Sequence, residues 1–120
     1  MGIERRLHPR ATVRLPAELR PHPKAEWQDV LLLDLSAGGA GVQAGTPLAS
    51  GAEVALRFRL PVTGSEQQAT IEVRALMVRS AAVVPPDLSR PYLFGLHFLD
   101  LDGEPFEIVR RHVWNCVHGS

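Results

Sequence analysis

Short runs in which apolar and polar residues alternate, each closed by proline or glycine, constrain the fold of this chain more than any other feature. Between Ala52 and Leu60 every second residue from Val54 onward is apolar, and the run from Ala69 to Arg79 repeats the pattern. Alternation with a period of two places the apolar side chains on one face of a strand. Several such runs separated by turn residues are typical of a small barrel or sandwich.

Four further segments are expected to be strands, and three residues of the expected strands disturb the simple pattern. Pro16 has no amide hydrogen, which predicts an edge position or a bulge. The segment Val30-Leu31-Leu32-Leu33 is apolar on both faces and predicts a central strand. Val78 interrupts the alternation, and Gly95 predicts a bulge or a close approach by another group. The four segments are 12–20, 27–35, 40–44 and 92–99.

Helical periodicity is found only near the end of the chain. Asp102-Gly103-Glu104-Pro105 is a helix-start signal, because acidic residues in the first turn oppose the positive end of the helix dipole. The helix is predicted from about Glu104 to Val117. Its apolar stripe, which we expect to close one end of the barrel together with Trp114, consists of Phe106, Val109, Val113 and Val117.

The length of 120 residues predicts a single domain over 1–120. Within it we expect a flexible, Arg-rich N-terminal segment at 1–11, a β-barrel at 12–100 and a C-terminal helix at 103–118. Thirteen basic and thirteen acidic residues give a formal net charge of zero, which does not favour nonspecific binding of DNA or RNA. Cys116 is the single cysteine, which excludes an intramolecular disulfide. With neither a signal-peptide pattern nor a membrane-spanning stretch, we expect a cytoplasmic protein without membrane insertion.

Basic residues concentrate at the start of the chain, where residues 1–24 hold six arginines and lysines against two glutamates. Arg5, Arg6 and Arg10 can converge on one anion if Pro9 kinks the backbone. A guanidinium grips phosphate in a bidentate way and also stacks on a purine, so this segment indicates a nucleotide ligand. A solvated tail is the alternative, and the spacing alone does not separate the two.

The run from Asp34 to Gly39 ends an apolar segment in small hydrogen-bonding residues. The Asp34 carboxylate can accept from guanine N1 and N2, and the Ser36 hydroxyl can donate to a phosphate or a carbonyl. Gly38 and Gly39 permit positive φ and a close approach of the backbone. The alternative is an ordinary turn between two strands, for which Asp, Ser and Gly are the usual residues.

Arg6-x-x-x-Arg10 followed by Asp34-x-Ser36-x-x-Gly39 resembles the PilZ domain, a bacterial receptor for cyclic di-GMP. The segment from Tyr92 to Phe98 is similar to the last strand of that family, which precedes a C-terminal helix. The resemblance implies an all-β fold with one C-terminal helix, namely a six-stranded antiparallel PilZ-type β-barrel. It also implies a ligand site on the outside of the barrel wall.

Specific roles follow from the same resemblance. Arg6 and Arg10 would contact the phosphates and Hoogsteen edges of cyclic di-GMP, and Arg5 would stack on a base. Asp34, Ser36 and Gly39 would hold a guanine from the opposite side. The complete set of expected ligand-binding residues is Arg5, Arg6, Arg10, Asp34, Ser36, Gly38 and Gly39.

The resulting hypothesis is a bacterial cyclic di-GMP receptor. Its N-terminal arm, Ile3 to Pro9, would fold over the barrel on binding and alter the surface seen by a protein partner. The alternative is a PilZ-like adaptor that binds no nucleotide and acts through protein contacts. We expect no enzyme, because the chain lacks a nucleophile-elbow motif and a phosphate-cradling glycine loop. His112 and Cys116 supply only two potential metal ligands, so we expect a surface histidine, a buried thiol and no metal or other cofactor.

Overall fold

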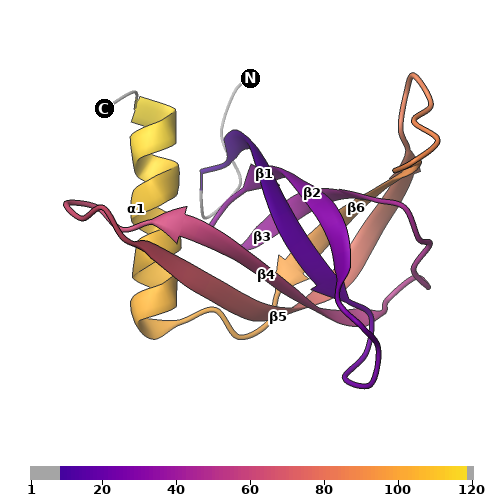
Figure 1. Ribbon diagram of the computed structural model, residues 1–120, viewed down its shortest axis with the longest axis horizontal. Coiled ribbons are helices and arrows are strands. Elements are labelled where there is room, and N and C mark those ends of the chain that lie inside the picture. The colour runs from indigo at the N-terminus through magenta and orange to yellow at the C-terminus, as the bar shows by residue number, and fades with distance from the viewer. Residues whose placement is uncertain (1–8, 119–120) are drawn as a thin grey trace, which may run out of the picture.

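The computed structural model describes residues 9–118, which form six strands and one helix (Figure 1). Neighbouring strands pair antiparallel in the order β1-β2-β3-β6-β5-β4, and pairing between β1 and β4 closes the barrel. The predicted six-stranded antiparallel barrel with a C-terminal helix is therefore confirmed. In chain order the elements are β1 (Ala11–Arg20), β2 (Gln28–Leu35), β3 (Gly39–Ala44), β4 (Glu53–Pro61), β5 (Gln68–Ala82), β6 (Tyr92–Phe98) and α1 (Gly103–His118).

The alternation seen in the sequence fills the interior of the barrel. Along β4, and along β5 from Ile71 to Met77, every second side chain is buried, and the residues between them lie on the outer face. Each large aliphatic side chain buried in this way contributes about 1.5–3 kcal/mol. The outward positions are consequently free to form a binding surface. The buried members are Val54, Leu56, Phe58 and Leu60 in β4 and Ile71, Val73, Ala75 and Met77 in β5.

Strand β1 accommodates its proline by changing partners along its length. Its register with β2 shifts between Thr12 and Leu15, which marks a bulge. Pairing with β4 begins only at Ala17, which lies opposite Phe58. Pro16 pairs with Leu31 of β2 and lies one residue before the ladder to β4. Of the two alternatives that Pro16 predicted, the bulge occurs in this strand, whereas β1 is not an edge strand because it pairs with both β2 and β4 in the closed barrel.

Helix α1 lies across one end of the barrel and contacts β1 and β4 (Figure 1). Val109 and Val113 are its buried residues. The prediction that Trp114 and Val117 join this contact is wrong, since they are 53% and 45% exposed. Successive helical residues are about 100° apart, so Trp114 points away from the face that Val113 buries. Its ring packs instead on His118, with centroids 3.8 Å apart. In residues 9–118 no helix is both long and apolar enough to cross a membrane.

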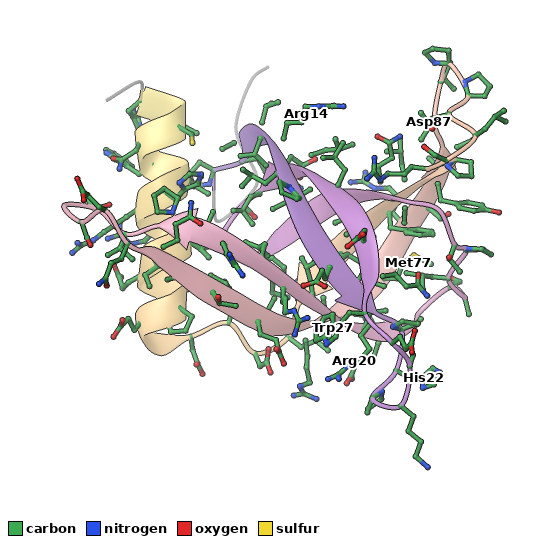
Figure 2. All side chains as sticks on the ribbon, viewed as in Figure 1. Arg14, Arg20, His22, Trp27, Met77 and Asp87 are labelled. Atoms are coloured by element: carbon green, nitrogen blue, oxygen red, sulfur yellow. The ribbon has the colours of Figure 1, made fainter. Side chains whose placement is uncertain are left out.

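Strands β5 and β6 continue beyond the rest of the barrel as a hairpin. β5 extends three residues past the predicted end at Arg79, because Ala82 still pairs with Tyr92. The connecting loop, residues 83–91, projects from the body of the molecule and carries Asp87 (Figure 2). The hairpin therefore extends the outer wall on the β5 and β6 side.

Candidate ligand-binding site

The turn between β2 and β3 is organised around the side chain of Ser36. Its hydroxyl oxygen accepts hydrogen bonds from the amides of Gly38 and Gly39, both at 3.1 Å. The Ser36 amide donates to the carbonyl of Gly39 at 2.9 Å. Ser36 is only 4% exposed. The Ser36 hydroxyl, which the sequence suggested would donate to a ligand, thus holds the turn together through the two glycine amides.

Gly38 and Gly39 allow the turn to lie close to the backbone of β6, but their own backbone angles are ordinary. A Cβ on Gly39 would lie 2.3 Å from the carbonyl oxygen of Leu96 on β6. The Gly38 carbonyl accepts a hydrogen bond from the amide of Phe98 at 2.9 Å. Neither glycine has a positive φ, so that part of the prediction is wrong. Both residues lie against β6, where the space next to the backbone is the limiting factor.

Arg10 and Asp34 meet at the edge of this turn although 24 residues separate them. The Arg10 guanidinium donates to Oδ1 of Asp34 in an ion pair whose side chains are 29% and 37% exposed. Ala11 pairs with Leu35, so the start of β1 brings Arg10 beside the end of β2. An anion arriving here meets a guanidinium that is already oriented by a carboxylate.

The Arg10–Asp34 pair opens onto a groove on the outer wall, which we call the site groove. It has a volume of about 380 Å³, and its lining includes Arg10, Asp34, Gly41, Gly95 and Arg79. Ligand sites commonly enclose about 300–1,000 Å³. Gly41 and Gly95 are paired neighbours on β3 and β6, so the floor between the charged side chains is backbone. A flat ligand can approach this floor closely.

Sequence reasoning did not assign Gly41 or Arg79 to the ligand site, although both line the groove. Gly95 was expected to mark a bulge or a close approach by another group, and the side chain of Arg79 lies beside it. A Cβ added to Gly95 would lie 3.4 Å from the Cβ of Arg79. The signal for Arg79 was the irregularity at Val78, where the register between β5 and β6 shifts.

A second group of arginines lies around Trp27, away from the loop that carries Asp87 (Figure 2). The guanidinium carbons of Arg20 and Arg57 lie 4.6 and 4.1 Å from the Trp27 ring centroid. Arg57 also donates to Glu18 at 2.8 Å, and this hydrogen bond lowers the pKa of Glu18. A larger cavity of about 670 Å³ adjoins Arg57 and Glu18. The lining of this cavity holds three acidic residues, Glu18, Asp29 and Glu72, against two arginines, whereas the site groove has two arginines against Asp34, so this region offers an anion less than the site groove does.

His112 and Cys116 on α1 supply only two potential metal ligands. Cys116 Sγ lies 3.5 Å from Nε2 of His112. Residues 9–118 contain no group of three or more His, Cys, Asp or Glu side chains suited to a metal ion. Cys116 is exposed and His112 is partly buried, so the expected buried thiol is wrong. Burial lowers the pKa of His112 below its usual value.

The sequence model of the PilZ domain family matches residues 4–114, almost the entire chain. The chain belongs to the PilZ domain family. No curated protein matches this PilZ domain. Of its expected ligand-binding residues, Arg10 and Asp34 line the site groove, and Ser36, Gly38 and Gly39 form the adjoining turn. Arg5 and Arg6 fall outside the described residues.

Solved structures share the fold of this PilZ domain. The Bacillus subtilis inhibitor of motility, MotI/DgrA, has a TM-score of 0.77 at 24% identity, covering 98% of this chain and 52% of MotI. The PilZ domain with c-di-GMP of YcgR from Escherichia coli has a TM-score of 0.66 at 15% identity, covering 97% and 94% of the two chains. The K. pneumonia MrkH–c-di-GMP complex has a TM-score of 0.70 at 17% identity, covering 98% and 54%. The PilZ domain thus spans about half the length of MotI and of MrkH.

Proposed function

We propose that this PilZ domain is a cyclic di-GMP receptor that binds its ligand in the site groove. The observation that carries the proposal is the Arg10–Asp34 pair, which brings together the two parts of the family motif beside a groove of suitable size. The c-di-GMP complexes of YcgR and MrkH, which have the same fold, support this assignment.

The chemistry of the groove suits a guanine dinucleotide. The Arg10 guanidinium supplies charge-assisted hydrogen bonds to a phosphate or to a guanine Hoogsteen edge. The Asp34 carboxylate is an acceptor, and guanine presents donors at N1 and N2. Asp34 pairs with Gly41 of β3, and the turn that follows is closed by hydrogen bonds from the Gly38 and Gly39 amides to the Ser36 hydroxyl. In this proposal the ligand takes over part of the pairing between Arg10 and Asp34.

The output is proposed to be mechanical. Arg5 and Arg6 join the ligand from the N-terminal side, so that the segment from Ile3 to Pro9 closes over the outer wall. The change in surface is then read by a protein partner in the bacterial cytoplasm. In this proposal the protein catalyses no reaction and requires no metal or other cofactor, and its ligand is cyclic di-GMP rather than DNA or RNA.

Calorimetric titration with cyclic di-GMP tests the proposal. We expect Arg6→Ala and Arg10→Ala each to lose about 1.5–3 kcal/mol of binding free energy, or roughly ten- to a hundredfold in affinity. Arg59→Ala is the matched control, because Arg59 is an exposed arginine on β4 outside the groove. GTP and cyclic GMP should produce no comparable heat. Unchanged affinity in the Arg10 variant would reject the site, and absence of wild-type binding would reject the function.

A protein-interaction adaptor remains the second candidate because of the loop at residues 83–91. Val84 and Leu88 in this loop are 87% and 98% exposed. The loop is nevertheless held in shape by Asp87, whose Oδ1 accepts from the Ser89 amide at 2.9 Å and from the Ser89 hydroxyl at 2.8 Å. Hydrogen bonds from Ser89 also lower the pKa of Asp87. A melting temperature that cyclic di-GMP leaves unchanged would favour this candidate over the receptor.

A further inference from the structure

Four residues at matching register positions cross the outer face of the barrel wall. Asp34 of β2 pairs with Gly41 of β3, Gly41 pairs with Gly95 of β6, and Gly95 pairs with Arg79 of β5. Neighbouring strands lie about 4.8 Å apart. The row therefore places a carboxylate and a guanidinium on either side of two glycines.

The charged side chains lean over these glycines from opposite directions. A Cβ on Gly41 would lie 2.5 Å from Oδ2 of Asp34, whereas a Cβ on Gly95 would lie 3.5 Å from Nε of Arg79. The guanidinium of Arg79 thus lies next to the backbone floor of the site groove. Arg10 lines the same groove. The groove consequently has a second guanidinium, on the side opposite Asp34.

A bulge in β5 is what turns Arg79 outward. Ala75 and Met77 point into the core, so strict alternation would send Arg79 inward as well. The register with β6 instead shifts between Met77 and Arg79, leaving Val78 as the extra residue. Both Val78 and Arg79 are exposed. The bulge places the guanidinium over the groove and avoids burying its charge.

Arg79 differs from Arg57 and Arg74, which are paired with acidic side chains on the barrel surface. Arg57 donates to Glu18 at 2.8 Å, and Arg74 donates to Asp100 at 3.0 Å. Within the part of the chain that the structure describes, no acidic side chain pairs with Arg79. Its donors are therefore available to a ligand in the groove.

We propose that Arg79 is a specificity-determining residue that donates two hydrogen bonds to the Hoogsteen edge of one guanine. This inference rests on the proposed cyclic di-GMP function. Guanine presents two acceptors on that edge, O6 and N7, which match the two parallel donors of a guanidinium. Adenine presents one acceptor and one donor there, so the same contact disfavours an adenine dinucleotide. Lysine carries the charge but lacks the planar fork.

Calorimetric titration with cyclic di-GMP of Arg79→Ala, Arg79→Lys and the Arg59→Ala control tests this role. We expect both Arg79 variants to lose roughly five- to a hundredfold in affinity, as for a lost bidentate base contact. The control should bind like wild type, and melting temperatures should show that all variants are folded. The inference would be overturned if Arg79→Ala bound cyclic di-GMP as tightly as wild type, or if Arg79→Lys did so.

An analogue built from 7-deazaguanine, which lacks the N7 acceptor, supplies a second readout. The factor by which this analogue binds more weakly than cyclic di-GMP should be smaller for Arg79→Ala than for wild type, because the contact is already absent. Equal factors would show that Arg79 does not contact N7. If wild type binds no cyclic di-GMP, the proposed function itself fails, whereas normal wild-type binding with an unaffected Arg79→Ala variant overturns only the role of Arg79.

Discussion

Replacing Ser36 by alanine is predicted to destabilise the whole domain as well as to weaken binding. The hydroxyl oxygen accepts two amide hydrogen bonds at 3.1 Å in a residue that is 4% exposed. Gly38 is half-buried, so water can replace the bond to its amide, and its loss costs about 0.5 kcal/mol. Gly39 is buried, so its unpaired amide costs about 1.5 kcal/mol. The expected loss of unfolding free energy is about 2 kcal/mol.

This loss corresponds to a measurable shift in both thermal and chemical unfolding. For 120 residues the entropy of unfolding is about 0.25 kcal/mol/K, so the melting temperature should fall by about 8 °C. In urea, the midpoint of Ser36→Ala should decrease while the slope of the free energy against denaturant stays constant.

Ser65→Ala provides a matched comparison for this measurement. The Ser65 hydroxyl also accepts an amide hydrogen bond, from Gln67 at 3.0 Å, but in an exposed turn. Water replaces that bond, so the variant should stay within about 0.5 kcal/mol of wild type. Equal effects of the two substitutions would refute the reasoning, because burial of the turn at Ser36 would then be irrelevant to its stability.

Other substitutions probe the glycines and the helix. Gly41→Ala places a Cβ 2.5 Å from Oδ2 of Asp34, so the carboxylate should move and calorimetric affinity for cyclic di-GMP should fall, while the melting temperature changes little. Gly39→Ala places a Cβ 2.3 Å from the Leu96 carbonyl oxygen, a backbone atom, and should cost about 1–3 kcal/mol in urea unfolding; wild-type stability would contradict this close approach. Burial lowers the pKa of His112, so the unfolded chain binds its proton more readily. The stability from neutral His112 is therefore present above about pH 6.5 and decreases as the pH falls through this value. His112→Gln should flatten the dependence of the urea midpoint on pH, and equal slopes would exclude His112 as its cause.

Much of the barrel could be predicted because alternation reports directly which side chains are buried. Val54 to Leu60 show the expected pattern of burial. Trp114 was predicted wrongly because an apolar residue next to a helical stripe can face either way, and the choice depends on how the helix crosses the barrel. Val78 interrupts the alternation in the sequence, but whether this interruption is a bulge depends on the register of β5 with its partner strand β6, which a single segment does not show.

The site was less predictable than the fold. The meeting of Arg10 and Asp34 followed from the family resemblance, since no local pattern relates two positions 24 residues apart. For Ser36, the sequence could not show whether the hydroxyl faces a ligand or its own turn, because the same donors and acceptors serve both. Arg79 was missed because its contribution depends on the irregular register of β5 with β6.

The backbone floor formed by Gly41 and Gly95 limits how ligand preference can be engineered in this domain. Main-chain atoms present the same hydrogen-bonding groups whatever residue is substituted, so the preference for one ligand over another can be changed only through the side chains beside the floor. A combinatorial library of Arg10, Asp34 and Arg79, the charged residues that line the groove, would therefore vary its side-chain recognition chemistry, while the inward-facing residues that stabilise the barrel stay constant.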